Sequence, residues 1–196
     1  MLMRDIPLYT LSEVDRLVGV MPGTASRWLR RSRTDGVSFE ELIEVLIVSV
    51  FRKQGLSYRD IRSINSECEK TFRISCPFTS WVFRTCGEQI LMEIKREFPW
   101  KNTLESTFVR LDYDEGRVSA WWPLGRSAGI RIAPEWGFGR PVIARRGIRT
   151  DILQERREAG DSIADIAGDY GLTPAEVETA LHFETYYMKG VTDSRH

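Results

Sequence analysis

Residues 139–184, GRPVIARRGIRTDILQERREAGDSIADIAGDYGLTPAEVETALHFE, determine the predicted fold of the C-terminal part of the chain. The stretch opens with the apolar run Pro141-Val142-Ile143 and continues into a basic turn around Gly147. Thr150 can accept hydrogen bonds from free backbone N–H groups, so we expect it to cap a helix that starts there. Gly160 favours the left-handed backbone that ends helices, so this helix is expected to stop just before it.

Two further helix starts follow in the same stretch. Ser162 is expected to cap a second helix, in which apolar residues repeat at helical spacing. Gly171 then turns the chain, and Thr173-Pro174-Ala175-Glu176 combines a capping box with proline at the first helical position. A helix, a glycine turn and a capped helix are the pattern of a helix-turn-helix.

The identities of the residues in this stretch are more informative than its helix pattern. The segments GRPVI at 139–143, SIADIAGDYGLT at 162–173 and EVETALHF at 176–183 resemble the C-terminal domain of a family of VapB-type antitoxins. Members of that family are partners of PIN-like ribonuclease toxins in bacterial toxin–antitoxin operons. The N-terminal residues fit the longer, two-headed version of the family, so the resemblance covers nearly the whole chain.

Residues 9–33 are a second candidate helix-turn-helix. Thr10 or Ser12 can cap a first helix, a turn is expected at Gly19, and Pro22 is expected at the start of a second helix. The second helix has a buried stripe at positions i, i+3 and i+4, formed by Ala25, Trp28 and Leu29.

The outward face of this second helix combines hydroxyl and arginine side chains. The candidate DNA-binding residues are Thr24, Ser26, Arg27, Arg30 and Arg31. Arginine can bind guanine through two hydrogen bonds, and hydroxyl and arginine groups both bind phosphate. A solvated arginine face on a core helix is the competing interpretation. The segment resembles the N-terminal half of a MerR-type helix-turn-helix, but Met21 stands where that family usually has a capping serine.

Two longer helices are expected next. Ser38-Phe39-Glu40-Glu41 is a capping box, Gly55 ends the helix that follows, and Ser57 caps another helix. The expected buried positions are Phe39, Leu42, Ile43, Leu46, Ile47, Val50, Ile61, Ile64 and Cys68. The segment FRKQGLSYRDIRSI at 51–64 resembles the helical pair that follows the wing in MerR regulators, although residues 32–37 are too few for a full β-wing. Arg59 and Arg62 are candidates for phosphate contact or for a solvated face.

Residues 74–138 are rich in β-branched and aromatic residues between turn breaks, which predicts a small antiparallel sheet. One hairpin is expected around Gly87, between 81–83 and 90–92. Another is expected between 107–113 and 117–122, and residues 129–132 are a candidate further strand. The acidic residues Asp112, Asp114 and Glu115 are interpreted as turn residues rather than as the metal site of a nuclease.

The predicted architecture is therefore α+β in three parts. Residues 1–73 form an N-terminal helical DNA-binding domain, and residues 74–138 form a small antiparallel β region. Residues 139–196 form a C-terminal helical domain that resembles a helix-turn-helix.

Composition excludes several classes of function. The 196 residues carry 28 Lys+Arg and 28 Asp+Glu, so any DNA binding must come from a local basic patch. The chain shows no apolar signal segment and no run of about 20 apolar residues, so a cytoplasmic protein without membrane contact is expected. Neither the three cysteines nor the two histidines show metal-ligand spacing, so no metal or cofactor is expected. Because no catalytic constellation appears, no catalytic residue is assigned, and an enzyme is the least favoured class.

The C-terminal unit differs from the N-terminal one in charge. Glu176, Glu178 and Glu184 would be repelled by a phosphate backbone, so this unit suits contact with a protein. The candidate partner-binding residues are basic near the turn, Arg145, Arg146 and Arg149, and apolar near the end, Tyr186, Tyr187 and Met188. Solvated loop arginines, and packing of the apolar residues on the β region, are the competing interpretations.

The residues and the resemblance together predict a DNA-binding antitoxin that represses its own operon. Its partners would be operator DNA and a PIN-like ribonuclease toxin. It would bind DNA as a homodimer, because one short recognition helix buries too little surface for strong specificity. The alternative is a ligand-responsive transcriptional regulator with a sensing β domain and no toxin.

Overall fold

The computed structural model describes residues 6–30, 36–74, 76–85 and 101–189. Its helices are α1 (Leu11–Val18), α2 (Thr24–Leu29), α3 (Phe39–Lys53), α4 (Tyr58–Phe72), α6 (Lys101–Phe108), α7 (Thr150–Glu158), α8 (Ile163–Tyr170) and α9 (Pro174–Phe183). A π-helical turn, Glu184–Met188, continues α9. The strands are β1 (Leu111–Asp114), β2 (Arg117–Trp121), β3 (Ile130–Arg131), β4 (Val142–Ile143) and β5 (Ile148–Arg149). This mixture of helices and small antiparallel sheets is the α+β class expected, and none of the described helices could cross a bilayer.

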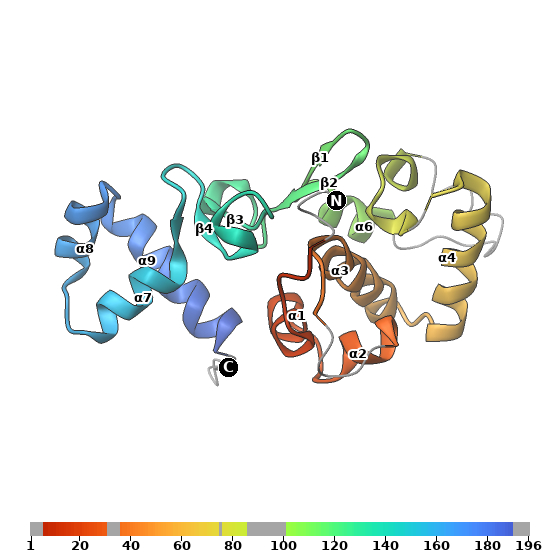
Figure 1. The fold of residues 1–196 in the computed structure, drawn as a ribbon, viewed down its shortest axis with the longest axis horizontal. Coiled ribbons are helices and arrows are strands. Elements are labelled where there is room, and N and C mark those ends of the chain that lie inside the picture. Colours follow the sequence, from red (N-terminus) through yellow and green to blue (C-terminus); the bar gives the residue numbers. More distant parts are fainter. Residues whose placement is uncertain (1–5, 31–35, 75, 86–100, 190–196) are drawn as a thin grey trace.

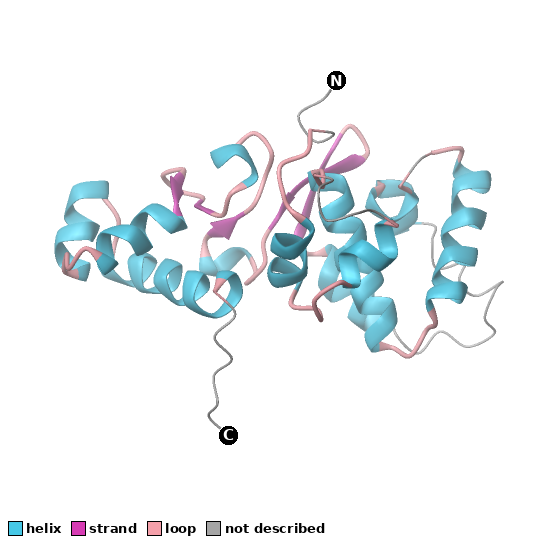
Figure 2. Cartoon of the chain, turned by 60° about the horizontal axis from the view of Figure 1, so that its bottom comes forward, coloured by secondary structure: helices cyan, strands magenta, loops and turns pink. Residues whose placement is uncertain are grey.

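The elements form two lobes along an elongated molecule (Figure 1). The N-terminal lobe holds α1–α4, α6 and the hairpin β1–β2, and the C-terminal lobe holds β3–β5 and α7–α9. Figure 2 shows the strands between the two groups of helices. The sheet β3-β4-β5 pairs Ile130 with Ile143 and Ile143 with Ile148, so it spans the predicted boundary between residues 138 and 139.

The lobes are joined by polar contacts between the first described residues and the loop before β4. The Tyr9 hydroxyl donates to the Gly139 carbonyl at 2.8 Å, and Arg140 Nη1 donates to Glu13 Oε1 at 2.5 Å. Gly139 has φ +77°, and a Cβ built there would lie 2.5 Å from the Tyr9 hydroxyl oxygen, so only glycine fits this approach. Buried apolar side chains continue through both lobes as one cluster.

The predicted local signals for helix starts are confirmed at five places. Four complete capping boxes pair Thr10 with Glu13, Ser38 with Glu41, Ser57 with Asp60 and Thr173 with Glu176. Ser162 also caps α8 by accepting from the Asp165 N–H. The positions predicted to be buried in α3 and α4 are buried, apart from Leu46, which is only partly buried. These predictions succeed because each rests on residues within one or two helical turns.

Thr150 is not the cap of α7, contrary to the prediction. Arg149 occupies the capping position and makes no side-chain cap, whereas Thr150 is the first helical residue and is buried. Its hydroxyl donates to Glu184 Oε1 at 2.5 Å, so the side chain is bonded to a buried carboxyl group rather than to its own helix. The helix does end at Glu158, before Gly160, as expected.

The middle of the chain contains less β structure than predicted. Residues 81–85 are helical, because Ser80 Oγ accepts from the Phe83 N–H at 3.1 Å and so caps a helical turn. Residues 90–92, the predicted partner strand, lie outside the described residues. The second hairpin is confirmed, with Glu115 and Gly116 at φ +49° and +77° in its two-residue turn. However, β1 starts at Leu111 because residues 107 and 108 belong to α6. The candidate strand at 129–132 is confirmed as β3.

Candidate nucleic-acid interface

A buried carboxylate fixes the start of α2. Asp15, on α1, accepts from the Gly23 N–H at 2.6 Å and from the Ala25 N–H at 2.8 Å. The helix therefore begins at Thr24, with Gly23 as its capping residue, and not at Pro22 as predicted. A carboxylate at this position accepts hydrogen bonds from free backbone N–H groups, and its negative charge is stabilised by the positive end of the helix dipole. The sequence signal for this contact is an acidic residue within the apolar stripe of α1, between Val14 and Leu17.

Trp28 and Arg62 fix the other end of α2. Trp28 is 5% exposed, and the Arg62 guanidinium lies 4.7 Å from the centre of its ring. Arg62 Nη2 also donates to the carbonyl oxygens of Arg27 and Trp28, both at 2.9 Å. The sequence left Arg62 as a candidate for phosphate contact or for a solvated face. In the structure it binds two carbonyl groups near the C-terminal end of α2. The backbone of this short helix is therefore held in place at both ends.

Two of the predicted DNA-binding side chains are exposed at the surface of α2 and its C-terminal cap. Arg27 and Arg30 are exposed, while Thr24 and Ser26 are partly buried. The Thr24 hydroxyl donates to the Met21 carbonyl at 2.6 Å, so it supports the turn before α2. Arg30 ends the helix with φ +55°, which points the chain away from the helix axis. Arg31 lies outside the described residues.

A groove, which we call the basic groove, adjoins this surface where α2, the end of α3 and the start of α4 meet. It has a volume of about 360 Å³ and is lined by Gly19, Val20, Met21, Thr24, Arg27, Ser49, Arg52, Lys53 and Tyr58. The guanidinium carbons of Arg27 and Arg52 lie 5.8 Å and 4.7 Å from the centre of the Tyr58 ring. Sequence reasoning did not assign Arg52 or Lys53, because their proximity to Arg27 arises only from the packing of α2 on α3.

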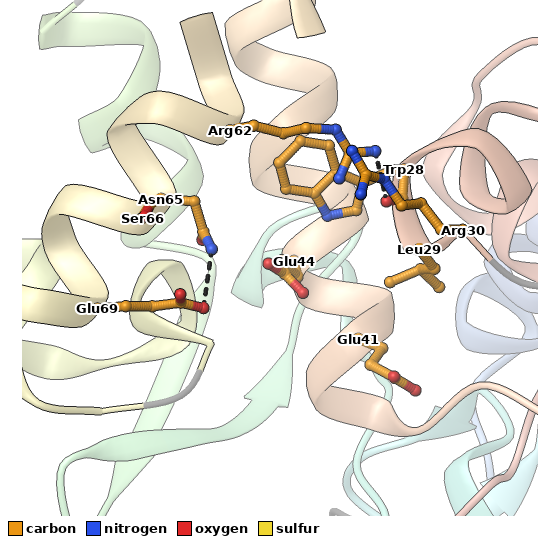
Figure 3. A pocket seen from close by; sticks show the side chains of 9 residues that line it. All are labelled: Trp28, Leu29, Arg30, Glu41, Glu44, Arg62, Asn65, Ser66 and Glu69. Atoms are coloured by element: carbon orange, nitrogen blue, oxygen red, sulfur yellow. Dashed lines mark hydrogen bonds between the residues drawn. The ribbon is translucent and has the colours of Figure 1, made fainter. Parts of the chain in front are cut away.

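A second pocket, which we call the acidic pocket, also borders α2 (Figure 3). Its volume is about 450 Å³, and it is lined by Trp28, Leu29, Arg30, Glu41, Glu44, Arg62, Asn65, Ser66 and Glu69. Glu44 projects from α3 toward Trp28 and is 7% exposed. Burial raises the pKa of Glu44 to about 7, the charge of Glu41 adds to this rise, and a hydrogen bond with the Trp28 side chain opposes it. The helix α2 and its C-terminal cap therefore contribute to two cavities of different charge.

The predicted basic partner-binding residues form ion pairs or hydrogen bonds within the C-terminal lobe. Arg145 donates to both carboxylate oxygens of Glu176 at 2.9 Å and to the Gly171 carbonyl at 2.8 Å. Arg146 also donates to Gly171, and Arg149 forms an ion pair with Asp151. The hydrogen bond from Arg145 lowers the pKa of Glu176 to about 2. The repulsion of phosphate expected from Glu176 is therefore reduced, because its carboxylate is paired with Arg145.

The predicted apolar partner-binding residues lie on the π-helical turn and are only partly exposed. The Tyr187 ring stacks on Phe183 with centroids 5.1 Å apart, and Tyr186 lies 4.3 Å from His182. Tyr187 and Met188 pack against the core, and the turn contacts α1. These residues therefore contribute to the junction between the lobes.

The acidic residues of the β1–β2 hairpin form ordinary polar contacts. Asp112 accepts from Trp122 Nε1 at 2.8 Å and from Arg126 Nη2 at 2.5 Å. Across the described ranges, no group of three or more His, Cys, Asp or Glu side chains is arranged to hold a metal ion.

Comparisons with known proteins support the antitoxin-like assignment at a coarse level. A family described as "Protein of unknown function (DUF433)" matches residues 130–183, a span that begins at β3. A Mycobacterium tuberculosis protein described as "Putative antitoxin VapB45" is 21% identical to this chain over 238 aligned residues, which cover 90% of this chain and 93% of that protein. The X-ray crystal structure of Rv2018 from Mycobacterium tuberculosis has the same fold, with a TM-score of 0.79 and 22% identity. That match covers 92% of this chain and 100% of the other.

Proposed function

We propose that this protein is the antitoxin of a type II toxin–antitoxin pair, that it binds operator DNA through its N-terminal lobe, and that it neutralises a PIN-like ribonuclease. The observation that carries the DNA-binding part is the short helix α2, held by Asp15 and Arg62, with the exposed side chains of Arg27 on the helix and Arg30 at its C-terminal cap. Distant similarity to an antitoxin over nearly the whole chain supports the toxin-binding part. We propose a cytoplasmic homodimer and no catalytic step.

DNA recognition by such a helix is favoured when the helix itself is ordered before binding, because ordering on binding lowers affinity. Here the backbone of α2 is bonded at both ends to α1 and α4, so the helix is already ordered. Exposed guanidinium groups on a fixed helix suit both guanine edges and phosphate oxygens.

Arg27→Ala is expected to weaken binding to the duplex upstream of the gene by roughly 1–3 kcal/mol if Arg27 makes a paired contact with a base. Arg30→Ala is expected to weaken binding to all duplexes alike and to reduce the salt slope by about one, as for a phosphate contact. Fluorescence anisotropy with upstream and unrelated duplexes measures both effects. Arg157→Ala is the matched control, because Arg157 is exposed on α7 in the other lobe. Unchanged affinity in both α2 variants would remove α2 from the interface.

A ligand-responsive transcriptional regulator is the second candidate, and the acidic pocket favours it. Any small molecule bound there would contact Trp28 and Arg30 and would therefore act on the same helix that carries Arg27. Co-expression with the neighbouring reading frame distinguishes the two functions. Co-purification of a PIN-like protein supports the antitoxin, whereas its absence, with DNA binding retained, supports the regulator.

A further inference from the structure

We propose that the basic groove binds the phosphate backbone of the DNA strand beside the bases that α2 reads, with Arg52 and Lys53 as additional phosphate-binding residues. The inference rests on the proposed DNA-binding function and extends the interface beyond α2. It adds residues from α3 that no sequence pattern assigned.

The side chains that line the basic groove give it a positive charge. Arg27, Arg52 and Lys53 all line it, and no carboxylate is among its described lining residues. The guanidinium carbons of Arg27 and Arg52 lie 5.8 Å and 4.7 Å from the centre of the Tyr58 ring, so two arginine cations border the groove at this ring. An anion bound in the groove would be attracted by these cations and by Lys53, and would accept charge-assisted hydrogen bonds from the side chains that reach it.

Two contacts hold the guanidinium group of Arg52 in a fixed position. Its Nη1 donates to the Leu56 carbonyl at 2.5 Å while its guanidinium carbon lies 4.7 Å from the Tyr58 ring centre. One face of the guanidinium group is therefore held by an aromatic ring, and one nitrogen is held by the loop between α3 and α4. The remaining N–H groups are directed by this anchoring, so Arg52 is preorganised for an acceptor.

The neighbouring helix ends do not reverse the sign of the groove. The C-terminal end of α3 has negative partial charge, and the N-terminal end of α4, which starts at Tyr58, has positive partial charge. These contributions oppose each other at this corner. The nearby carboxylate of Asp60 accepts from the backbone N–H and hydroxyl of Ser57 as part of the cap of α4.

The position of the groove identifies DNA as the source of the phosphate. Arg27 lines the groove and also stands on the exposed face of α2, so both surfaces are continuous. In Figure 1, α2 and the ends of α3 and α4 that meet it lie along one edge of the N-terminal lobe. A duplex that meets α2 on this side would place a backbone phosphate next to Arg52 and Lys53.

Arg52→Gln and Lys53→Gln test the proposal in the full-length protein, with anisotropy titrations against the upstream duplex and an unrelated duplex at several salt concentrations. Each variant is expected to weaken binding to both duplexes by the same factor, roughly threefold to tenfold, and to reduce the salt slope by about one. Lys70→Gln is the control, because Lys70 is exposed in the last turn of α4 and loses the same charge. Lys53→Gln keeps the test valid if Arg52→Gln fails to fold, since Lys53 is an exposed residue in the last turn of α3.

The outcomes separate this proposal from the function on which it rests. If the wild-type protein binds the upstream duplex and Arg27→Ala weakens it, unchanged affinity and salt slope in both groove variants overturn the groove while DNA binding stands. If the wild-type protein binds neither duplex, both proposals are overturned. Inorganic phosphate is the third probe. If it raises the thermal stability of the wild type but not of Arg52→Gln, and the groove variants bind DNA normally, the groove is a small-anion site instead.

Discussion

Trp28→Ala is expected to destabilise the N-terminal lobe by roughly 3–5 kcal/mol, the usual cost of removing a large aromatic side chain from a core. Trp28 is 5% exposed, lies under the Arg62 guanidinium and stacks near Tyr58 with centroids 6.4 Å apart. The substitution would leave a cavity, and it would also remove the ring on which Arg62 rests while that arginine binds the end of α2. Urea unfolding followed by circular dichroism measures the loss.

Trp136→Ala is the matched control for this prediction. Trp136 is 39% exposed, so less apolar surface returns to water when it is removed, and a smaller loss of stability is expected. Equal stability of the wild type and the Trp28→Ala variant would show that the buried stripe of α2 contributes little to the fold. The assignment of Trp28 as the anchor of α2 would then be wrong.

Glu44→Gln is expected to stabilise the protein above neutral pH. Burial first, and then the charge of Glu41, raise the pKa of Glu44 from 4.5 to about 7 in the folded protein. Below about pH 4.5 the carboxyl group is protonated in both the folded and the unfolded state. Between about pH 4.5 and 7 the unfolded chain releases this proton before the folded protein does, so the free energy of unfolding falls as pH rises. The total loss is on the order of 3–4 kcal/mol, because a difference of one in pKa corresponds to about 1.4 kcal/mol and the pKa rises from 4.5 to about 7.

Glutamine keeps the shape of the side chain and an acceptor for Trp28, but it cannot ionise. The Glu44→Gln variant should therefore lack this fall in stability, and the difference from the wild type should grow from pH 5 to pH 8. Chemical unfolding at several pH values measures it. Glu178→Gln, at an exposed position on α9, is the control for the same chemical change. If the wild type and the Glu44→Gln variant lose stability in parallel across this range, Glu44 is not the group responsible.

The sequence predicted the features that depend on neighbours within one or two helical turns. The capping boxes of Thr10, Ser38, Ser57 and Thr173 follow this rule. Of the predicted stripe on α2, Ala25 and Trp28 are buried, whereas Leu29 is only partly buried. The errors arose where a side chain binds a distant element. Thr150 has the chemistry of a cap, but its hydroxyl bonds to Glu184, 34 positions later.

The difference between local contacts and contacts with distant elements also explains which features of the candidate interface were not predicted. The sequence located Arg27 and Arg30, because their exposure follows from the helical period of α2. It did not identify the role of Asp15, which caps a different helix, or the proximity of Arg52 to Arg27. It also did not reveal that Arg145 and Glu176 bind each other, because that contact joins a loop to a helix 31 positions away. Such contacts depend on tertiary packing, which local patterns do not specify.

Polar contacts and a shared cluster of buried side chains connect the two lobes. Glu13 closes the capping box of α1 and also binds Arg140, so one carboxylate supports a helix in one lobe and the loop before β4 in the other. Asp15, two positions later on α1, holds the start of α2. A disturbance at Arg140 is therefore only two contacts away from the helix that carries Arg27. The two lobes are thus connected through α1, so we expect changes at Arg140 to affect the position of α2 in the other lobe.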